Sequence, residues 1–270
     1  MTNRFSLDGK TALVTGAGGI LGSRICEGLL ESGAKVVVVD IDIEASQLVA
    51  AELNKITVGG AISIQCDVSD VASVDQMTSR AVDVFGAIDI LVNNAATKSD
   101  DLNAFFAPFE EYSLDEWRKV MSVNIDGMFL VAQSVGIQMV KQGRGGSIIQ
   151  TSSIYGLAAP DQRIYRGSSY LGREINTPAV YTTSKAAVIG LTNHLATYWA
   201  DKGIRVNTIT PGGMESGQND EFKQRYSQRV PMNRMGSPDE IVGAVIYLAS
   251  DASGYVTGHN IVIDGGLTCW

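Results

Sequence analysis

The sequence TALVTGAGGILG, from Thr11 to Gly22, decides how the fold of this chain begins. Its apolar start predicts a short buried strand over Thr11–Thr15, and the helical spacing over Ile20–Ser32 predicts a helix. Glycines between them let the backbone approach a pyrophosphate closely, and the start of a helix offers free N–H groups and a partial positive charge. The stretch therefore predicts the first strand, turn and helix of a dinucleotide-binding unit.

The alternation of strand and helix continues along the whole chain. Six further strands are expected at Val36–Val39, Ala61–Cys66, Ile88–Val92, Ser147–Thr151, Ile204–Ile209 and Asn260–Ile263. Helical patterns lie between them at Val71–Phe85, Leu114–Gln142, Ala179–Ala200 and Asp239–Ala249. Strands separated by helix-length segments imply right-handed crossovers. We therefore expect an α/β fold over residues 1–270, a single Rossmann-like, doubly wound parallel sheet of about seven strands with helices on both faces.

Composition excludes several classes of function. The net charge of −8 and the lack of any basic tract argue against nucleic acid as a partner. The longest apolar runs, such as Val36–Val39, are too short to cross a bilayer, and the N-terminus lacks the apolar core of a signal peptide. Three scattered cysteines and two separate histidines offer no disulfide framework and no metal site. A cytoplasmic protein without a metal is the expectation.

An acidic residue ends the second strand and bears on the choice of cofactor. Asp40 lies 18 positions beyond Gly22. A carboxylate there can accept hydrogen bonds from both hydroxyls of the adenosine ribose and would repel a 2′-phosphate. Because no Arg or Lys lies in the glycine turn or just after Asp40, NAD is favoured over NADP. The alternative is that Asp40 is only a solvated strand-end residue. Asp67 and Val68, after the third strand, could meet the adenine edge in the same way.

Two Tyr–Lys pairs with a spacing of four residues lie on one predicted helix. Tyr181 and Lys185 stand at its start, and Tyr198 and Lys202 stand near its end. A tyrosine hydroxyl titrates near pH 10, and a neighbouring ammonium favours the phenolate, so such a pair can act as a general base. Pairs 17 residues apart on a helix lie roughly 25 Å apart, so they cannot share a site. The first pair is nearer the cofactor end of the sheet.

Seven motifs occur along the chain in the order that is typical of one enzyme family. The chain resembles the short-chain dehydrogenases/reductases over essentially its whole length. The motifs are Thr15–Gly22, Asn93-Asn94-Ala95-Ala96, Val123–Gly127, Ser153 with Gly156, Tyr181 with Lys185, Pro211-Gly212 and Thr257-Gly258 followed by Asp264–Gly266.

The resemblance implies a role for each matching residue. Tyr181 would take or return the proton of the substrate hydroxyl, and Lys185 would hold the nicotinamide ribose and lower the pKa of Tyr181. Ser153, rather than its neighbour Ser152, would hydrogen-bond the reacting oxygen, and Asn124 would position a water. The resemblance also implies a homotetramer. The cofactor contacts expected are Gly16, Gly19, Ile20, Gly22, Asp40, Ile41, Asp67, Val68, Asn94, Ala95, Tyr181, Lys185, Pro211 and Gly212.

Three features depart from the family pattern. Ile20 stands where these enzymes usually have glycine, so that Gly16, Gly19 and Gly22 have the spacing of the longer sugar-nucleotide epimerase/dehydratase branch. Ala96 replaces a glycine. Ser153 and Tyr181 lie 28 positions apart, about twice the usual spacing, because residues 159–178 are inserted between them.

The insertion 159–178 and the segment 212–236 interrupt the strand–helix rhythm and are the expected substrate walls. Long loops at the carboxyl ends of parallel strands usually carry function. The insertion is modestly cationic, and guanidinium groups suit carboxylates or phosphates. We therefore expect an anionic or sugar-derived substrate, as the weak similarity to members associated with flagellin modification also suggests. Alternatively, the arginines pair with acids on another subunit. The candidate substrate residues are Tyr155, Arg163, Arg166, Arg173 and Met214.

These observations favour an NAD-dependent oxidoreductase that interconverts a secondary alcohol and a ketone on a small polar molecule. A sugar-nucleotide epimerase or dehydratase that retains its NAD is the alternative within the same chemistry. A non-catalytic NAD(H)-binding regulator is the alternative from another class. The presence of Asn124, Ser153, Tyr181 and Lys185 together counts against the regulator, since binding alone does not need all four.

Overall fold

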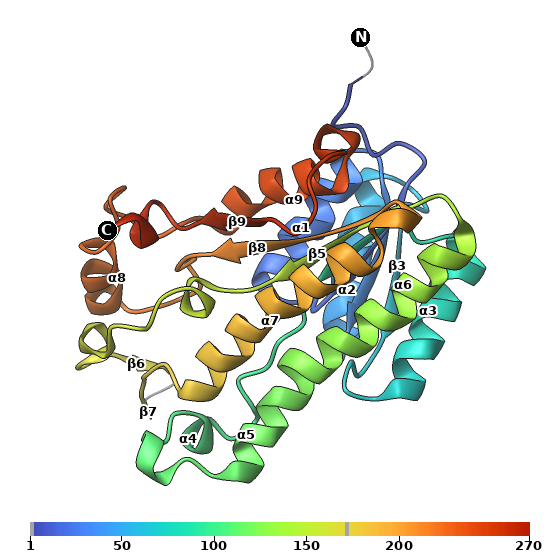
Figure 1. Cartoon of the computed structure of the whole chain (residues 1–270). Coiled ribbons are helices and arrows are strands. Elements are labelled where there is room, and N and C mark those ends of the chain that lie inside the picture. Colours follow the sequence, from blue (N-terminus) through green and yellow to red (C-terminus); the bar gives the residue numbers. More distant parts are fainter. Residues whose placement is uncertain (1–2, 171–172) are drawn as a thin grey trace.

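The computed structural model describes residues 3–170 and 173–270, and a seven-stranded parallel sheet forms its centre (Figure 1). The strand order is β3-β2-β1-β4-β5-β8-β9, with every pairing parallel. This confirms the expected doubly wound sheet. The strands are β1 (Thr11–Thr15), β2 (Lys35–Asp40), β3 (Ala61–Gln65), β4 (Ile90–Asn93), β5 (Gly146–Thr151), β8 (Ile204–Pro211) and β9 (Asn260–Ile263).

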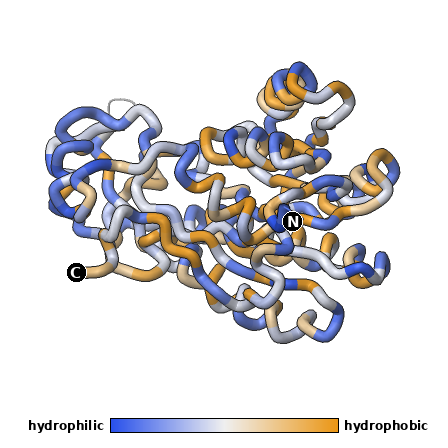
Figure 2. The backbone as a smooth tube through the Cα atoms, turned by 90° about the horizontal axis from the view of Figure 1, so that it is seen from above, coloured by the Kyte–Doolittle hydropathy of each residue, from blue (hydrophilic) through white to orange (hydrophobic). Residues whose placement is uncertain are grey.

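Helices cover both faces of the sheet, as expected. Alternate residues of one strand enter different cores: Val36 and Val38 pack with the first set of helices, and Val37 packs with the second. Figure 2 shows apolar stretches running through the middle of the molecule and hydrophilic ones concentrated in the outer loops. The first set is α1 (Ile20–Glu31), α2 (Ile43–Ile56) and α9 (Val242–Ala249), and the second is α3 (Val71–Phe85), α6 (Met128–Gln142) and α7 (Ala179–Tyr198).

Helix α2 has no counterpart among the helices expected from the sequence. Asp42 caps its first turn, because the carboxylate accepts hydrogen bonds from the backbone N–H groups of Glu44 and Ala45. Its buried positions are Ser46, Ala50 and Leu53, two of them small, whereas Leu48 is exposed. The apolar stripe is therefore weak in the sequence, although the helix completes the crossover between β2 and β3.

The predicted long helix over residues 114–142 is present, with an irregular centre. A π-helical turn (Ser122–Gly127) joins α5 (Leu114–Met121) to α6. The continuous helix is long and apolar enough to cross a membrane by composition alone, with a mean hydropathy of 1.4. Its apolarity is explained by packing, because Val131, Val135 and Met139 are fully buried against the sheet.

The loops at the carboxyl ends of the strands carry additional short elements. The insertion 159–178 contains a 3₁₀ turn and the antiparallel strands β6 (Ser169–Tyr170) and β7 (Arg173–Glu174), and the segment 212–236 contains α8 (Asp220–Ser227). In Figure 1 these elements lie to the left, where β8 and β9 point. The remaining elements are α4 (Leu102–Phe105) and 3₁₀ turns at Phe109–Glu111, Ile154–Gly156, Gln162–Tyr165, Ala200–Lys202, Pro238–Ile241, Asp251–Ser253 and Leu267–Cys269.

The strand order reverses direction between β1 and β4. From β1 the chain runs outward through β2 and β3, and then it returns to the other side of β1 to build β4, β5, β8 and β9. Crevices at such a switch point, beyond the carboxyl ends of the strands, are where ligands bind in open α/β sheets. The glycine turn after β1 and the Asn93–Ala96 motif after β4 flank this point.

Candidate active site

The glycine turn leaves no room for side chains at three positions. A Cβ on Gly16, whose φ is +63°, would lie 2.9 Å from the Cα of Ala95, and one on Gly22 would collide with the carbonyl oxygen of Gly16. A Cβ on Gly18 would lie 2.8 Å from the Cβ of Ala45. Gly18 was not among the cofactor contacts expected from the sequence. Gly19 has ordinary space around it, and Ile20 is half-exposed at the first position of α1.

This turn fits the pyrophosphate of a dinucleotide. Gly19 is the N-cap of α1 and provides no side-chain hydrogen bond to the first turn. The first N–H groups of the helix thus keep their donors for a ligand, and the helix dipole favours negative charge there. The close packing of Gly16 and Gly22 holds the backbone in a cradle that an added Cβ would fill.

Asp40 stands at the end of β2 and faces the glycine turn. Its Oδ2 accepts a hydrogen bond of 2.9 Å from the N–H of Gly18, and its Oδ1 accepts one of 3.1 Å from the N–H of Asp42. The neighbouring Ile41 is largely exposed. The carboxylate is therefore fixed beside the turn, in the position expected for a group that contacts the adenosine ribose.

Asp67 and Val68 follow β3 on the same edge of the sheet. The carboxylate of Asp67 accepts hydrogen bonds from the N–H and the hydroxyl of Ser69, which shapes the turn. Val68 is buried, and it lies so close to Gly127 that a Cβ on the glycine would meet it at 2.7 Å. Val68 thus packs against the π-helical turn, while Asp67 shapes the loop that precedes α3.

Thr15 joins the glycine turn to the Asn-Asn-Ala-Ala motif. Its hydroxyl accepts hydrogen bonds from the N–H groups of Asn94 and Ala95, at 3.0 and 3.1 Å. In return, the side-chain amide of Asn94 donates to the carbonyl oxygen of Thr15 at 3.2 Å. The ends of β1 and β4 are thereby locked together, which builds the floor of the crevice at the switch point.

Asn124 lies inside the π-helical turn and is fully buried. Its Oδ1 accepts a 2.8 Å hydrogen bond from the N–H of Thr97, and its Nδ2 donates to the hydroxyl of Ser184 at 3.3 Å. Such π turns inside helices are frequent at functional sites. The amide therefore connects the loop after β4 to α7, directly behind the Tyr181–Lys185 turn.

Ser152 and Gly156 fix the loop after β5 against α7. The hydroxyl of Ser152 donates a 2.7 Å hydrogen bond to the carbonyl oxygen of Lys185, which supports a structural role for this serine. A Cβ on Gly156 would lie 2.6 Å from the same carbonyl oxygen. The spacing of Ser153 and Gly156 is thus explained, because glycine is what lets the loop approach the helix.

Ser153, Tyr181 and Lys185 come together at the carboxyl edge of the sheet. The side chains of Tyr181 and Ser153 lie close enough for Ser153 to affect the pKa of Tyr181. Lys185 is buried, its Nζ donates to the carbonyl oxygen of Thr151 at 3.0 Å, and it lies 6.0 Å from the centroid of the Tyr181 ring. The structure therefore brings the sequence-predicted catalytic residues into one cluster, with Asn124 behind it.

The pKa of Tyr181 departs from the expected direction. Burial raises it above its ordinary value, and the Ser153 side chain opposes that rise. Burial also lowers the pKa of Lys185 to about 8. The expected depression of the Tyr181 pKa by a neighbouring ammonium is thus absent here, because the amine is turned toward Thr151 and desolvation dominates at both groups.

The second Tyr–Lys pair lies away from this cluster. Tyr198 is 65% exposed at the end of α7, and the amine of Lys202 pairs with the carboxylate of Asp201 at 2.9 Å. The pair is a surface feature, as its position near the helix end predicts.

Pro211, Gly212 and Met214 follow β8 in the segment 212–236. Pro211 is the last residue of the strand, and the N–H of Gly212 donates to the carbonyl oxygen of Ile263 at 2.8 Å. Met214 is partly buried and packs against the core and against Gly236. These residues continue the crevice from β5 toward β9.

Among the described side chains of the insertion, the arginines are not assembled into a cationic site. Arg163 is exposed, and both of its hydrogen bonds of 2.8 Å go to the carboxylate of Asp161. Arg166 lines a surface hollow, and its carbonyl oxygen accepts a hydrogen bond from Arg225. The side chain of Arg173 lies outside the described residues. The positive charge of Arg163 is therefore neutralised within the insertion by Asp161.

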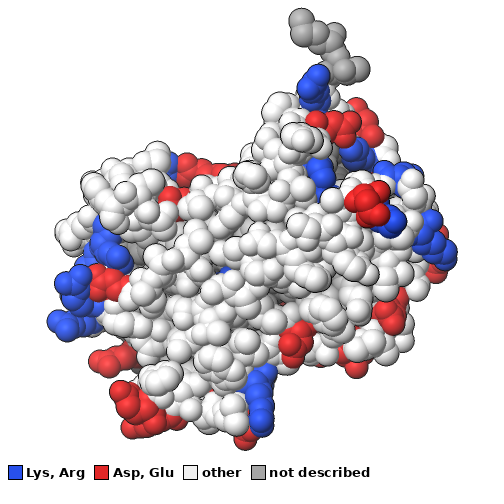
Figure 3. Space-filling view, in the orientation of Figure 1, with Lys and Arg blue, Asp and Glu red and all other residues white. Residues whose placement is uncertain are grey.

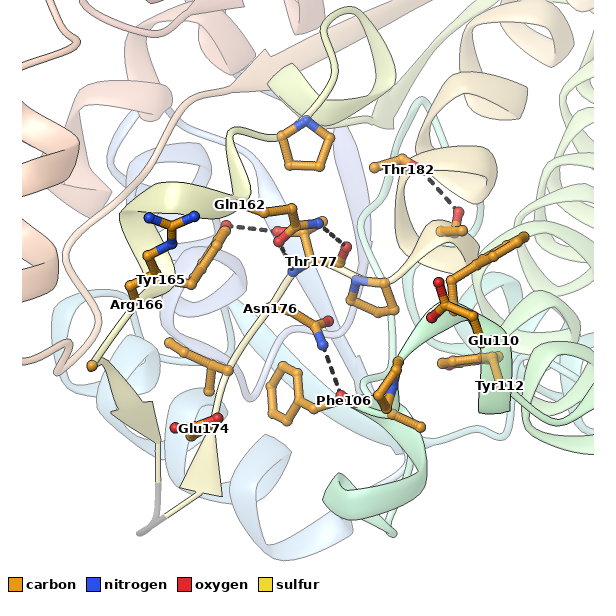
Figure 4. Close-up of a pocket in the computed structure, with 18 residues that line it drawn as sticks. Phe106, Glu110, Tyr112, Gln162, Tyr165, Arg166, Glu174, Asn176, Thr177 and Thr182 are labelled. Carbon is orange, nitrogen blue, oxygen red and sulfur yellow. Dashed lines mark hydrogen bonds between the residues drawn. The ribbon is translucent and has the colours of Figure 1, made fainter.

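The hollow beside the insertion has a volume of about 900 Å³ (Figure 4). One wall comes from the insertion, including Gln162 and Tyr165, and the other comes from Phe106–Tyr112. Asn176 crosses its floor and donates a 2.7 Å hydrogen bond to the carbonyl oxygen of Phe106. The insertion is thus anchored to the loop before α5, next to the start of α7.

Two tyrosines link the insertion to the catalytic loop. The hydroxyls of Tyr155 and Tyr165 lie 3.1 Å apart, and that of Tyr165 lies 2.6 Å from the hydroxyl of Thr177. Tyr155 follows Ser153 by two residues, and the Tyr165 hydroxyl is near enough to raise the pKa of Tyr181. Tyr165 was not among the candidate substrate residues, and the structure places it beside the catalytic cluster.

A family model described as enoyl-(acyl carrier protein) reductase matches residues 16–268. A D-threitol dehydrogenase of Mycolicibacterium smegmatis is 36% identical over 98% of this chain and 95% of its own length. The fold and the site thus define an oxidoreductase with a nicotinamide dinucleotide cofactor. The chain belongs to the short-chain dehydrogenase/reductase family.

Two solved structures are similar over nearly the whole chain. A gluconate 5-dehydrogenase from Burkholderia cenocepacia, in complex with NADP and tartrate, has a TM-score of 0.86 and 35% identity, covering 99% of this chain and 98% of that one. A short-chain dehydrogenase from Leptospira borgpetersenii with bound NAD⁺ has a TM-score of 0.84 and 33% identity, covering 99% and 96%. Both cofactors thus occur among similar structures.

Proposed function

We propose that this chain is an NAD-dependent dehydrogenase that interconverts a secondary alcohol and a ketone on a polyol or a sugar acid. The observation that carries the proposal is the cluster of Ser153, Tyr181 and Lys185 next to the glycine turn at the switch point of the sheet. The substrate class is supported by the threitol and gluconate dehydrogenases to which the chain is similar.

In the direction of oxidation, the hydroxyl of the substrate lies between Ser153 and Tyr181. Ser153 donates a hydrogen bond to the reacting oxygen and stabilises the charge that develops on it. Tyr181 in its phenolate form takes the hydroxyl proton, and in reduction the phenol returns that proton. Because burial favours the neutral phenol in the ligand-free protein, the positive charge of bound NAD would supply the stabilisation that the phenolate needs. Bound NAD supplies the acceptor for the hydride that leaves the same carbon. Lys185 holds the nicotinamide ribose, and Asn124 keeps α7 in register behind both residues.

NAD is proposed over NADP because of Asp40. Its carboxylate is fixed beside the glycine turn by the N–H of Gly18. In this position it would accept hydrogen bonds from ribose hydroxyls and repel a 2′-phosphate. The sequence places no Lys or Arg in the turn or just after Asp40 to offset the repulsion.

We further propose a cytoplasmic homotetramer. Phe129, Ile137 and Val140 leave an exposed apolar face on α6. Figure 3 shows that much of the face over α6 and α7 carries no charged side chains, which lie mainly around its rim. Burial of such a face between copies of the chain would remove apolar surface from water.

The test is turnover by the wild type, Tyr181→Phe and Tyr198→Phe with NAD and with NADP, followed by the absorbance of the reduced cofactor. The panel contains threitol, sorbitol, arabinitol and gluconate. We expect Tyr181→Phe to lose at least about 100-fold in kcat, because a general acid/base contributes about 10²–10⁴-fold. Tyr198→Phe, the matched control with the same spacing to a lysine, should stay within about twofold.

Two results would contradict the proposal. If Tyr181→Phe retained wild-type turnover, another residue would be the base. If the wild type bound NADH but gave no net reduced cofactor on any substrate, a regulator or an enzyme that retains its NAD would replace the dehydrogenase.

A further inference from the structure

Arg229 is an arginine of the segment 212–236 whose side chain reaches across to the insertion. It follows α8, and its Nε lies 3.6 Å from Oδ2 of Asp161 in the insertion. Its Nη1 is buried and has no hydrogen-bond partner among the described residues. Half of the guanidinium thus faces a carboxylate, while the other half presents a buried donor. A buried donor without a partner is unfavourable, so one kept in place calls for an acceptor.

Three tyrosine hydroxyls lie within electrostatic reach of Arg229. Tyr226 precedes it by one turn, and Tyr155 and Tyr165 pack against the same apolar cluster as Tyr226. Burial raises the pKa of each hydroxyl, and the positive charge of Arg229 opposes the rise in all three. Arg229 is therefore close enough to act on these hydroxyls, and one of them belongs to Tyr155, two residues after Ser153.

The charge balance leaves room for an anion. Asp161 is shared by two arginines, because Arg163 binds it through two hydrogen bonds and Arg229 lies 3.6 Å away. Arg163 is exposed and engages the carboxylate fully, whereas Arg229 is two-thirds buried. The three side chains Asp161, Arg163 and Arg229 therefore carry a net charge of +1. The unneutralised positive charge is that of Arg229, the more buried of the two arginines.

We propose that Arg229 binds the carboxylate of a sugar-acid substrate, with the hydroxyls of Tyr155 and Tyr165 contacting the hydroxyls of its carbon chain. A guanidinium fork matches the two oxygens of a carboxylate. This inference rests on the proposed function and makes it more specific. It moves the anion site from the arginines of the insertion to the segment 212–236, where Asp161 positions Arg229 from across the wall.

The experiment compares two substrates with the same six-carbon skeleton, gluconate and sorbitol, which differ in carrying a carboxylate or a hydroxymethyl group. We expect Arg229→Gln to raise the KM for gluconate at least about tenfold, with kcat and the KM for sorbitol within about threefold. Arg229→Lys keeps the charge and loses the fork, so its KM for gluconate should fall between those of the wild type and Arg229→Gln. Arg163→Gln, the matched control from the same trio, should leave both KM values within about threefold.

Binding without turnover gives a second readout. Isothermal titration calorimetry measures it directly, without a tryptophan signal to which Trp117, Trp199 and Trp270 would all contribute. Gluconate titrated into the enzyme–NADH complex should bind the wild type and Arg163→Gln, and Arg229→Gln should bind it at least about tenfold more weakly.

The two proposals fail in different ways. If the wild type oxidises sorbitol but neither oxidises nor binds gluconate, the anion site is wrong and the dehydrogenase stands. The anion site is also wrong if Arg163→Gln weakens the binding of gluconate and Arg229→Gln does not. The same conclusion follows if Arg229→Gln raises the KM values for gluconate and sorbitol equally. If no substrate is turned over but gluconate binds in an Arg229-dependent way, the dehydrogenase is wrong and the anion site stands.

Discussion

The catalytic cluster and the substrate wall share one edge of the sheet but are held together in different ways. In the cluster, segments far apart in sequence meet through their backbones: Gly156 packs on the carbonyl of Lys185, and Thr15 accepts two amides of the next motif. In the wall, the ion pairs are mostly local, as between Arg225 and Glu221. The chemistry therefore depends on contacts that tolerate no added atom, while specificity depends on side chains that can change one at a time.

The wall touches the cluster through few side chains. Tyr165 reaches Tyr155 beside Ser153, and Asp161 reaches Arg229. These contacts join the insertion 159–178 to the loop after β5 and to the segment 212–236. Changes in the wall should thus alter which substrate is accepted, and changes in the cluster should alter stability or turnover for every substrate.

The largest expected effect concerns the catalytic cluster, and it is the pH dependence of stability that the buried Lys185 causes. Burial lowers the folded-state pKa of Lys185 from 10.5 to about 8, so between these pH values the unfolded chain binds the proton more tightly. Lys185 should therefore contribute a rise in the free energy of unfolding of the ligand-free protein across this window, by about 3 kcal/mol in full. Burial also raises the pKa values of the Cys26 and Cys66 thiols and of Tyr181, which act in the opposite direction above about pH 9 and pH 10, so the contribution of Lys185 is the difference between the wild type and a variant without this amine.

Denaturant titrations from pH 8 to 10 check this dependence in the wild type, Lys185→Met and Lys202→Met. With rising pH, Lys185→Met should lose stability relative to the wild type, whereas Lys202→Met, whose lysine is exposed, should follow the wild type. An unchanged slope in Lys185→Met would show that the buried amine does not differ from a solvated one.

An intermediate effect is expected from one methyl group at the loop–helix contact. Gly156→Ala places a Cβ 2.6 Å from the carbonyl oxygen of Lys185, so the loop or α7 must shift, at a cost of about 2 kcal/mol. Gly190→Ala is the control in the same helix, where the new Cβ meets no described atom within 4 Å and alanine should add up to about 1 kcal/mol. Unfolding midpoints measure both. Equal stability of the two variants would mean that the cluster is not tightly packed.

The smallest effect is expected at the cofactor end. Asp40→Asn removes the charge that would repel a 2′-phosphate, so the ratio of kcat/KM for NAD to that for NADP should fall about tenfold, or about 1.4 kcal/mol. Asp42→Asn is the control, because asparagine also caps α2. The role of Asp40 is refuted if both variants keep the wild-type ratio.

Much of this molecule was predictable from the sequence because its signals are local. The β-branched run Val36–Val39 predicts a strand without further information, and the glycines after Thr15 predict a turn. The expected seven-stranded sheet was confirmed. Helix α2 was missed because its buried face is small and Leu48 is exposed. Gly18 was missed because its constraint comes from Ala45, on a different helix.

The electrostatics were less predictable, because they depend on distant partners. The direction of the Tyr181 pKa follows from burial, which the Tyr–Lys spacing does not reveal. The charge of Arg163 was expected to serve a ligand, yet Asp161 lies two residues earlier and engages it. Arg229 was not predicted from the sequence as a substrate residue, because its partner Asp161 comes from another loop. The nearby Tyr155, Tyr165 and Tyr226 also come from three different segments.

The strand order also has a consequence for how this chain folds while it is being synthesised. Ala12 pairs with Val36 on one side of β1 and with Ile90 on the other. When synthesis starts at the N-terminus, β1, β2 and β3 can pair while β4 does not yet exist. At about 5–20 residues per second, the second edge of β1 then stays open for roughly a few seconds. During that interval the unpaired N–H and C=O groups of β1 form an open sheet edge beside the glycine turn. At this stage the chain can pair with a strand of another chain and misassociate.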